Sequence, residues 1–144
     1  MRALRKAKRS IASPRRAITP SVRGQSLVEL ALTLPLLMIL MAGVLDLAHA
    51  FSLAGILSNA AREGARYGAT DPTNTDTITN RVVEEAAGAP LTIDPGQVVV
   101  NTDSGTTSGN AITVAVTHDV DLLLSQALGL PPPTIRRQAT MVIF

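Results

Sequence analysis

Gly24, Gln25 and Glu29 are the residues whose types and spacing could support chemistry, and they lie between a basic N-terminal tail and an apolar run. A membrane-bound peptidase needs extended, unobstructed backbone at the bond that it cuts, and glycine has no Cβ to obstruct it. Cleavage after Gly24 would leave an α-ammonium group on Gln25. A carboxylate at the edge of an apolar helix is costly without a partner. We therefore expect Glu29 to pair with that ammonium group, on the same subunit or on a neighbouring one.

The positive charge of the chain is concentrated in its tail. Eight of the 13 Lys and Arg residues lie in residues 1–24, which contain no acid, whereas the remaining residues carry five basic and 11 acidic side chains. Such a tail could bind nucleic acid, bind anionic lipid or set membrane orientation. Because it has no aromatic residue and an apolar segment follows it directly, we expect orientation and lipid contact, and no nucleic acid. The positive-inside rule then places the N-terminus in the cytoplasm.

Residues 27–45 are nearly all apolar and match the roughly 20 residues that a helix needs to cross a bilayer. Pro35 removes one backbone hydrogen bond and predicts a kink, and Thr33 could satisfy the carbonyl that is freed. An alternative is a cleavable secretory signal, because residues 48–50 satisfy a small-x-small pattern. Cleavage there would release a soluble product.

The helical pattern continues beyond the apolar run to residue 69, where Asp71 and Pro72 predict its end. Small and apolar residues at spacings of three and four predict a buried face. This face consists of Phe51, Ala54, Leu57, Ala61, Ala65 and Gly68. Polar residues lie off it, and Glu63 and Arg66 are spaced to form a weak ion pair. We interpret Tyr67, the single tyrosine, as a packing or interface residue.

The C-terminal half predicts a small α+β domain. A second helix is expected over residues 76–87, with an N-cap from residues 73–75 and an apolar stripe that includes Ile78 and Val82. Three strands are expected at residues 97–101, 111–117 and 140–144, with a short turn at 122–124 and a stiff proline segment at 131–133. The strands would form an antiparallel meander packed against the helices.

Motifs for catalysis or cofactor binding are weak in this sequence. The chain has no cysteine, no Gly-rich phosphate loop and no zinc signature. His118, Asp119 and Asp121 form a weak metal-binding pattern, which we interpret as solvated charges at a strand edge. We therefore expect no cofactor, no metal and no enzymatic activity.

Four sequence segments together resemble the TadE-like family, the minor pseudopilins of the tight-adherence (Flp) pilus system. They are Arg-Gly-Gln-Ser-Leu-Val-Glu-Leu-Ala-Leu at 23–32, Leu-Pro-Leu-Leu at 34–37, Gly-Val-Leu-Asp at 43–46 and Asn-Ala-Ala-Arg-Glu-Gly-Ala-Arg-Tyr at 59–67. The resemblance covers about residues 23–69. In the C-terminal half it extends only to the strand-rich character.

The resemblance implies processing by a prepilin peptidase between Gly24 and Gln25, on the cytoplasmic side, with Glu29 as the acid of the pilin signal. The family helix motif would comprise Asn59, Arg62, Glu63, Gly64, Arg66 and Tyr67. The implied partners are the prepilin peptidase, other pilins and pseudopilins of the Flp pilus, the inner-membrane assembly platform and the lipid bilayer.

We expect three parts: a basic cytoplasmic leader at 1–24, a transmembrane helix with its extension at 25–69, and an exported α+β domain at 70–144. The protein would cross the cytoplasmic membrane once or be incorporated in a pilus. The alternative is an unprocessed, signal-anchored membrane protein whose exported domain binds an envelope partner.

Overall fold

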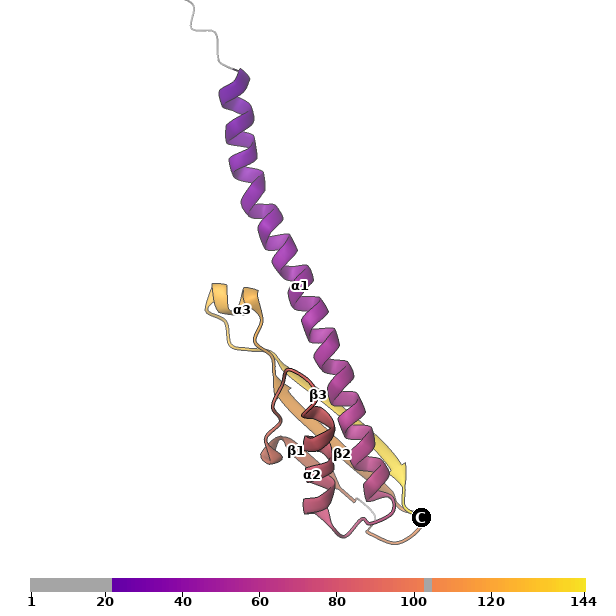
Figure 1. Cartoon of the computed structure of the whole chain (residues 1–144). Coiled ribbons are helices and arrows are strands. Elements are labelled where there is room, and N and C mark those ends of the chain that lie inside the picture. The colour runs from indigo at the N-terminus through magenta and orange to yellow at the C-terminus, as the bar shows by residue number, and fades with distance from the viewer. Residues whose placement is uncertain (1–21, 103–104) are drawn as a thin grey trace, which may run out of the picture. The chain divides into compact units, whose positions relative to one another are not determined.

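The computed structural model of the chain describes residues 22–102 and 105–144. It divides into two compact units, residues 1–35 and 36–144. One long helix, α1 (Val22–Gly68), contributes residues to both units (Figure 1). The described residues are helical from Val22, so α1 includes residue 25, where the predicted transmembrane part starts. The predicted division at residues 24 and 69 stays a prediction.

Thr33, in the part of α1 that belongs to the first unit, does not make the predicted bond to the carbonyl that Pro35 leaves free. The Thr33 hydroxyl donates to the carbonyl oxygen of Glu29 at 2.8 Å and to that of Leu30 at 3.3 Å. Pro35 instead removes the amide that would bond to the carbonyl of Ala31. The expected role of Thr33 was wrong because a threonine in a helix reaches the carbonyls three and four residues before it. The helix continues through Pro35.

The second unit contains the rest of α1, two further helices, a short 3-10 turn and a three-stranded sheet. These elements are α2 (Thr75–Ala86), η1 (Pro95–Gln97), β1 (Val98–Asn101), β2 (Ala111–Asp119), α3 (Leu123–Leu128) and β3 (Thr134–Val142). The sheet order is β1-β2-β3 and both pairings are antiparallel. The predicted α+β class with an antiparallel meander is therefore confirmed.

Two elements differ from the predicted ones. β3 begins at Thr134 rather than at residue 140. The prediction missed its first half because that half carries arginine and glutamine and lacks the alternating apolar pattern. The turn predicted at residues 122–124 is the start of α3, which ends where Gly129 adopts a left-handed conformation with φ of 66°.

The second helix closely follows its prediction. The Asn74 side chain accepts a hydrogen bond from the amide of Thr77 at 3.2 Å, which satisfies one of the free donors at the start of α2. Ile78, Val82 and Ala86 are buried on one face. α2 therefore presents an apolar stripe to the core.

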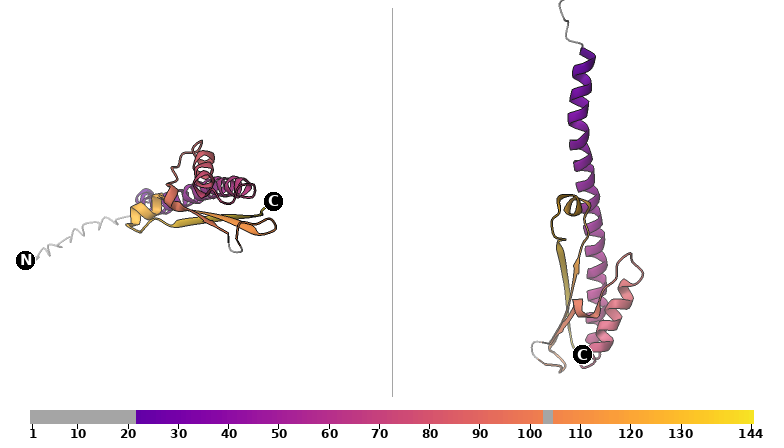
Figure 2. Two further views of the ribbon diagram at one scale, coloured as in Figure 1. Left: turned by 90° about the horizontal axis from the view of Figure 1, so that it is seen from below. Right: turned by 90° about the vertical axis from the view of Figure 1, so that its left-hand side faces the viewer.

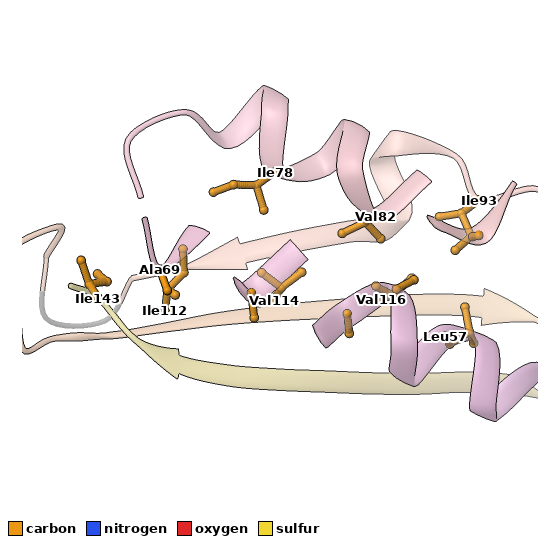
Figure 3. Packing of buried hydrophobic residues seen from close by; sticks show 13 residues of the cluster. Leu57, Ala69, Ile78, Val82, Ile93, Ile112, Val114, Val116 and Ile143 are labelled. Carbon is orange, nitrogen blue, oxygen red and sulfur yellow. The ribbon is translucent and has the colours of Figure 1, made fainter. Parts of the chain in front are cut away.

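The core lies between the helices and one face of the sheet, as Figure 2 shows. The predicted alternation along β2 is confirmed, because Ile112, Val114 and Val116 are fully buried. Figure 3 shows them on the face of β2 that is turned toward the helices, opposite Ile78 and Val82 of α2. This arrangement buries the apolar faces of both helices against a single sheet.

The small-residue face of α1 is buried from Leu53 onward, but Phe51 is not part of it. Ala54, Leu57 and Ala61 are buried as predicted, whereas Phe51 is 68% exposed. The prediction for Phe51 was wrong because the buried stripe passes through Leu53 and Ala54. Phe51 is left at the edge, where it lines a shallow groove beside β3.

Candidate functional site

Gly24, Gln25 and Glu29 share one face of α1, where they line a shallow hollow with Val28 and Leu32. The bond between Gly24 and Gln25 lies in helical backbone. A peptidase acts on extended backbone, so cleavage requires this part of the helix to open.

Glu29 is placed to pair with a new N-terminus at Gln25. The two residues are four positions apart and therefore lie one above the other on a helix surface. The Glu29 side chain is exposed. Its carboxylate is therefore open to an ammonium group of the same chain or of a neighbouring one.

The apolar run of α1 is largely exposed. Its large apolar side chains between residues 27 and 45 are 52–72% exposed. The helix is long and apolar enough to cross a membrane, and its apolar window is not buried inside the protein. Lipid is the natural environment for such a surface.

Gly64, within the family helix motif, lets three elements approach closely. A Cβ at this position would overlap Cγ2 of Val82 on α2 and lie 3.3 Å from Cγ1 of Val114 on β2. At Gly68, one turn later, a Cβ would lie 2.5 Å from Cδ1 of Ile112. The two glycines therefore form a notch in α1 that α2 and β2 fill.

The charged residues of the motif lie on the outer side of the helix. Arg66 donates from Nε to Glu63 at 2.8 Å and from Nη2 at 2.5 Å. The hydrogen bond from Arg66 lowers the pKa of Glu63, and desolvation opposes this effect. Because Arg66 is 68% exposed, the pair contributes little to stability. Asn59 and Arg62 are exposed as predicted.

Tyr67 is partly buried and packs against the core cluster. The guanidinium of Arg81 on α2 lies 5.6 Å from the centre of its ring, which is a cation–π distance. The expectation that Tyr67 is a packing residue agrees with this position between α1 and α2.

Asp46 has a structural role that the sequence analysis missed. Its carboxylate is buried, with 7% of the residue exposed. Oδ1 accepts a hydrogen bond from the amide of Leu123, and Oδ2 accepts one from the amide of Leu124, both at 2.8 Å. Asp46 therefore caps the start of α3 from a distant part of the chain. The available signal was an acid placed directly after the apolar run.

The described residues offer little for metal or acid–base chemistry. In the ranges 22–102 and 105–144, no group of three or more His, Cys, Asp and Glu side chains could hold a metal ion. Asp119 accepts a hydrogen bond from the hydroxyl of Thr134, and the buried Nδ1 of His118 has no hydrogen-bond partner. The residues that line a pocket between the end of α2 and residues 89–93 include no titratable side chain.

Comparison with known proteins gives one match. The model of the family described as TadE-like protein matches residues 24–66, which agrees with the resemblance seen in the sequence. No match was found among curated proteins or among solved structures. The matched region starts at Gly24 and lies entirely within α1.

Proposed function

We propose, with the TadE-like match over residues 24–66 as the premise, that this protein is a minor pseudopilin. It would be a single-pass membrane protein that acts in assembly of a tight-adherence (Flp type IVb) pilus, after a prepilin peptidase cleaves the Gly24–Gln25 bond. Members of the TadE-like family are pilus components and not enzymes, so we propose that this protein has a structural role. The observation that carries the proposal is that the match begins at Gly24 and follows a helix of membrane-spanning length.

The charge distribution supports an orientation with the N-terminus in the cytoplasm. All eight basic residues of the tail precede Gln25. They hold the precursor on the cytoplasmic side through the positive-inside rule. Cleavage at Gly24 removes these eight charges, and the product is acidic because it keeps 11 acids and five basic residues.

Cleavage would create the ammonium group with which Glu29 pairs during assembly. In the apolar environment between packed helices, an unpaired carboxylate is costly. The ammonium group of Gln25, on the same or on an adjacent subunit, offsets that cost. A buried ion pair of this kind contributes more to register and specificity than to stability. The pair would therefore set how this subunit aligns with other pilins and pseudopilins.

The exported domain presents its surface to other proteins of the assembly. α2 and the sheet pack on the part of α1 that follows the membrane segment. The proposed partners are the prepilin peptidase, the inner-membrane assembly platform, the lipid bilayer and the other pilins of the Flp pilus.

Replacing Glu29 by glutamine should leave cleavage intact and impair assembly. Breaking a buried pair by removing one partner costs about 3–5 kcal/mol. Incorporation of this subunit should therefore fall at least tenfold, since about 1.4 kcal/mol already corresponds to a factor of ten. The measurement is quantitative immunoblotting of the subunit in sheared pili and in membranes of the native host.

The matched control is Glu85→Gln, which removes one exposed acid from α2. It should be incorporated at the level of the unmodified protein. Equal incorporation of the Glu29 and Glu85 variants would refute the role of Glu29 in assembly.

A further inference from the structure

We propose that α3 and the residues that follow it, Leu123–Leu130, lie in the lipid interface of the membrane that α1 crosses. This segment would sit on the far side, where the exported domain begins. The inference rests on the proposed membrane crossing of α1, but the TadE-like match says nothing about it because the match ends at residue 66.

The position of α3 along α1 is set by contacts that Asp46 and Gly43 of α1 make with the start of α3. Asp46 binds the amides of Leu123 and Leu124, each at 2.8 Å. One turn earlier on α1, Gly43 lies beside the Leu124 side chain. A Cβ added at Gly43 would be 3.5 Å from Cδ1 of Leu124, which is ordinary van der Waals contact. Both contacts are made at the end of the apolar run 27–45. Figures 1 and 2 show α3 beside α1, beyond the end of the sheet.

The outer surface of α3 is apolar and exposed. Leu123, Leu128 and Leu130 are 56%, 69% and 57% exposed. No charged residue occurs from position 122 to position 133. Moving the exposed part of a leucine side chain out of water is favourable. Three such side chains next to the end of a membrane helix would therefore favour contact with lipid.

Several backbone amides of the segment have internal hydrogen-bond partners, which lowers the cost of placing them near lipid. Asp46 satisfies the first two amides of α3, and the amide of Leu130 donates to the carbonyl of Ser125 at 2.8 Å. The following residues 131–133 are prolines and carry no amide hydrogen.

The same contacts explain why Asp46 is buried at this point of α1. A carboxylate at the end of a membrane segment is costly unless it is paired. Two charge-assisted hydrogen bonds from backbone amides offset that cost and hold α3 against α1. A second protein is a poorer candidate to cover α3, because stable protein interfaces take about 20–30 residues a side. α3 and its flank offer far fewer.

The chain contains no cysteine, so a single introduced cysteine can carry a fluorescent label at one chosen position. The full chain would be reconstituted in vesicles of phosphatidylethanolamine and phosphatidylglycerol, with an NBD label at Leu128→Cys. Part of the lipid would carry a nitroxide quencher, either near the glycerol end or near the methyl end of an acyl chain. Leu36→Cys, in the middle of the apolar run, reports membrane crossing, and Val99→Cys on β1 reports an exposed residue outside the membrane.

The label at Leu128→Cys should be quenched several-fold more than the label at Val99→Cys. The nitroxide near the glycerol end should be the stronger quencher. Asp46→Ala in the same background should reduce this quenching, and Asp46→Asn should reduce it less because it keeps one acceptor oxygen.

Three results would overturn the inference. If Leu36→Cys is quenched while Leu128→Cys is quenched no more than Val99→Cys, α3 lies outside the lipid and the membrane crossing stands. A label at Leu128→Cys that is shielded from water but not quenched by lipid would show that protein covers α3. If Leu36→Cys is not quenched either, the membrane crossing fails together with the inference.

Discussion

Replacing Gly64 by leucine is expected to destabilise the α+β domain strongly. The first added carbon already overlaps Val82, and Val114 lies behind it. Overpacking of this kind costs about 1–3 kcal/mol or more. That loss outweighs the gain of about 1 kcal/mol from removing a glycine from a helix. A small domain with only about 5–15 kcal/mol of stability would lose a large share of it.

The control for this prediction is Gly55→Leu in the same helix, because a Cβ at Gly55 meets no atom within 4 Å. It should leave stability unchanged or raise it by up to about 1 kcal/mol. The measurement is the urea midpoint of the full chain in nanodiscs, followed by the fluorescence of Tyr67, since the chain has no tryptophan. Equal midpoints for the two variants would show that Gly64 is not a packing requirement.

Replacing Gly24 by leucine is expected to block maturation. A bulky side chain beside the scissile bond obstructs the peptidase and stabilises the helical turn that must open, because glycine is a poor helix former. A misplacement of about 1 Å at a reacting bond can cost 100-fold in rate. The full-length precursor should therefore accumulate in membranes of the native host.

The readout for Gly24→Leu is the ratio of precursor to mature chain, measured by immunoblotting after a pulse of synthesis. Gly55→Leu makes the same chemical change outside the signal and should mature normally. If the Gly24 variant matures at the rate of the unmodified chain, the peptidase does not cut at this bond.

The elements with a clear local pattern were predicted from the sequence. The alternation of Ile112, Val114 and Val116 identified β2 and its buried face. The candidate caps at residues 73–75 indicated the start of α2, where the structure uses Asn74. These signals are local, because they depend on the periodicity of a few neighbouring residues. The small-residue face of α1 was also visible, although the partners that fill its notch were not.

The features that were missed depend on contacts between distant residues. Asp46 and Leu123 are 77 positions apart, so no local pattern links them. The first half of β3 has no apolar alternation because it lies at the edge of the sheet, where polar side chains remain exposed. Phe51 matches the helical spacing of the buried face in the sequence. Only the position of the sheet shows that it lies beside the core and stays exposed.

The candidate site was predicted in its residues but not in its conformation. The sequence indicated Gly24, Gln25 and Glu29, and the structure places them on one helical face. A peptidase needs extended backbone at the bond that it cuts, whereas Gly24 and Gln25 are helical in the described conformation. Cleavage therefore requires local unwinding, which the peptidase must induce or capture.

The most direct test of the central claim is the N-terminal sequence and intact mass of the protein isolated from its native membranes. The proposed function predicts a chain that begins at Gln25 and lacks the eight basic residues of the tail. A chain that begins at Met1 would contradict it. The protein would then be an unprocessed, signal-anchored membrane protein, and Glu29 would have no ammonium partner on Gln25.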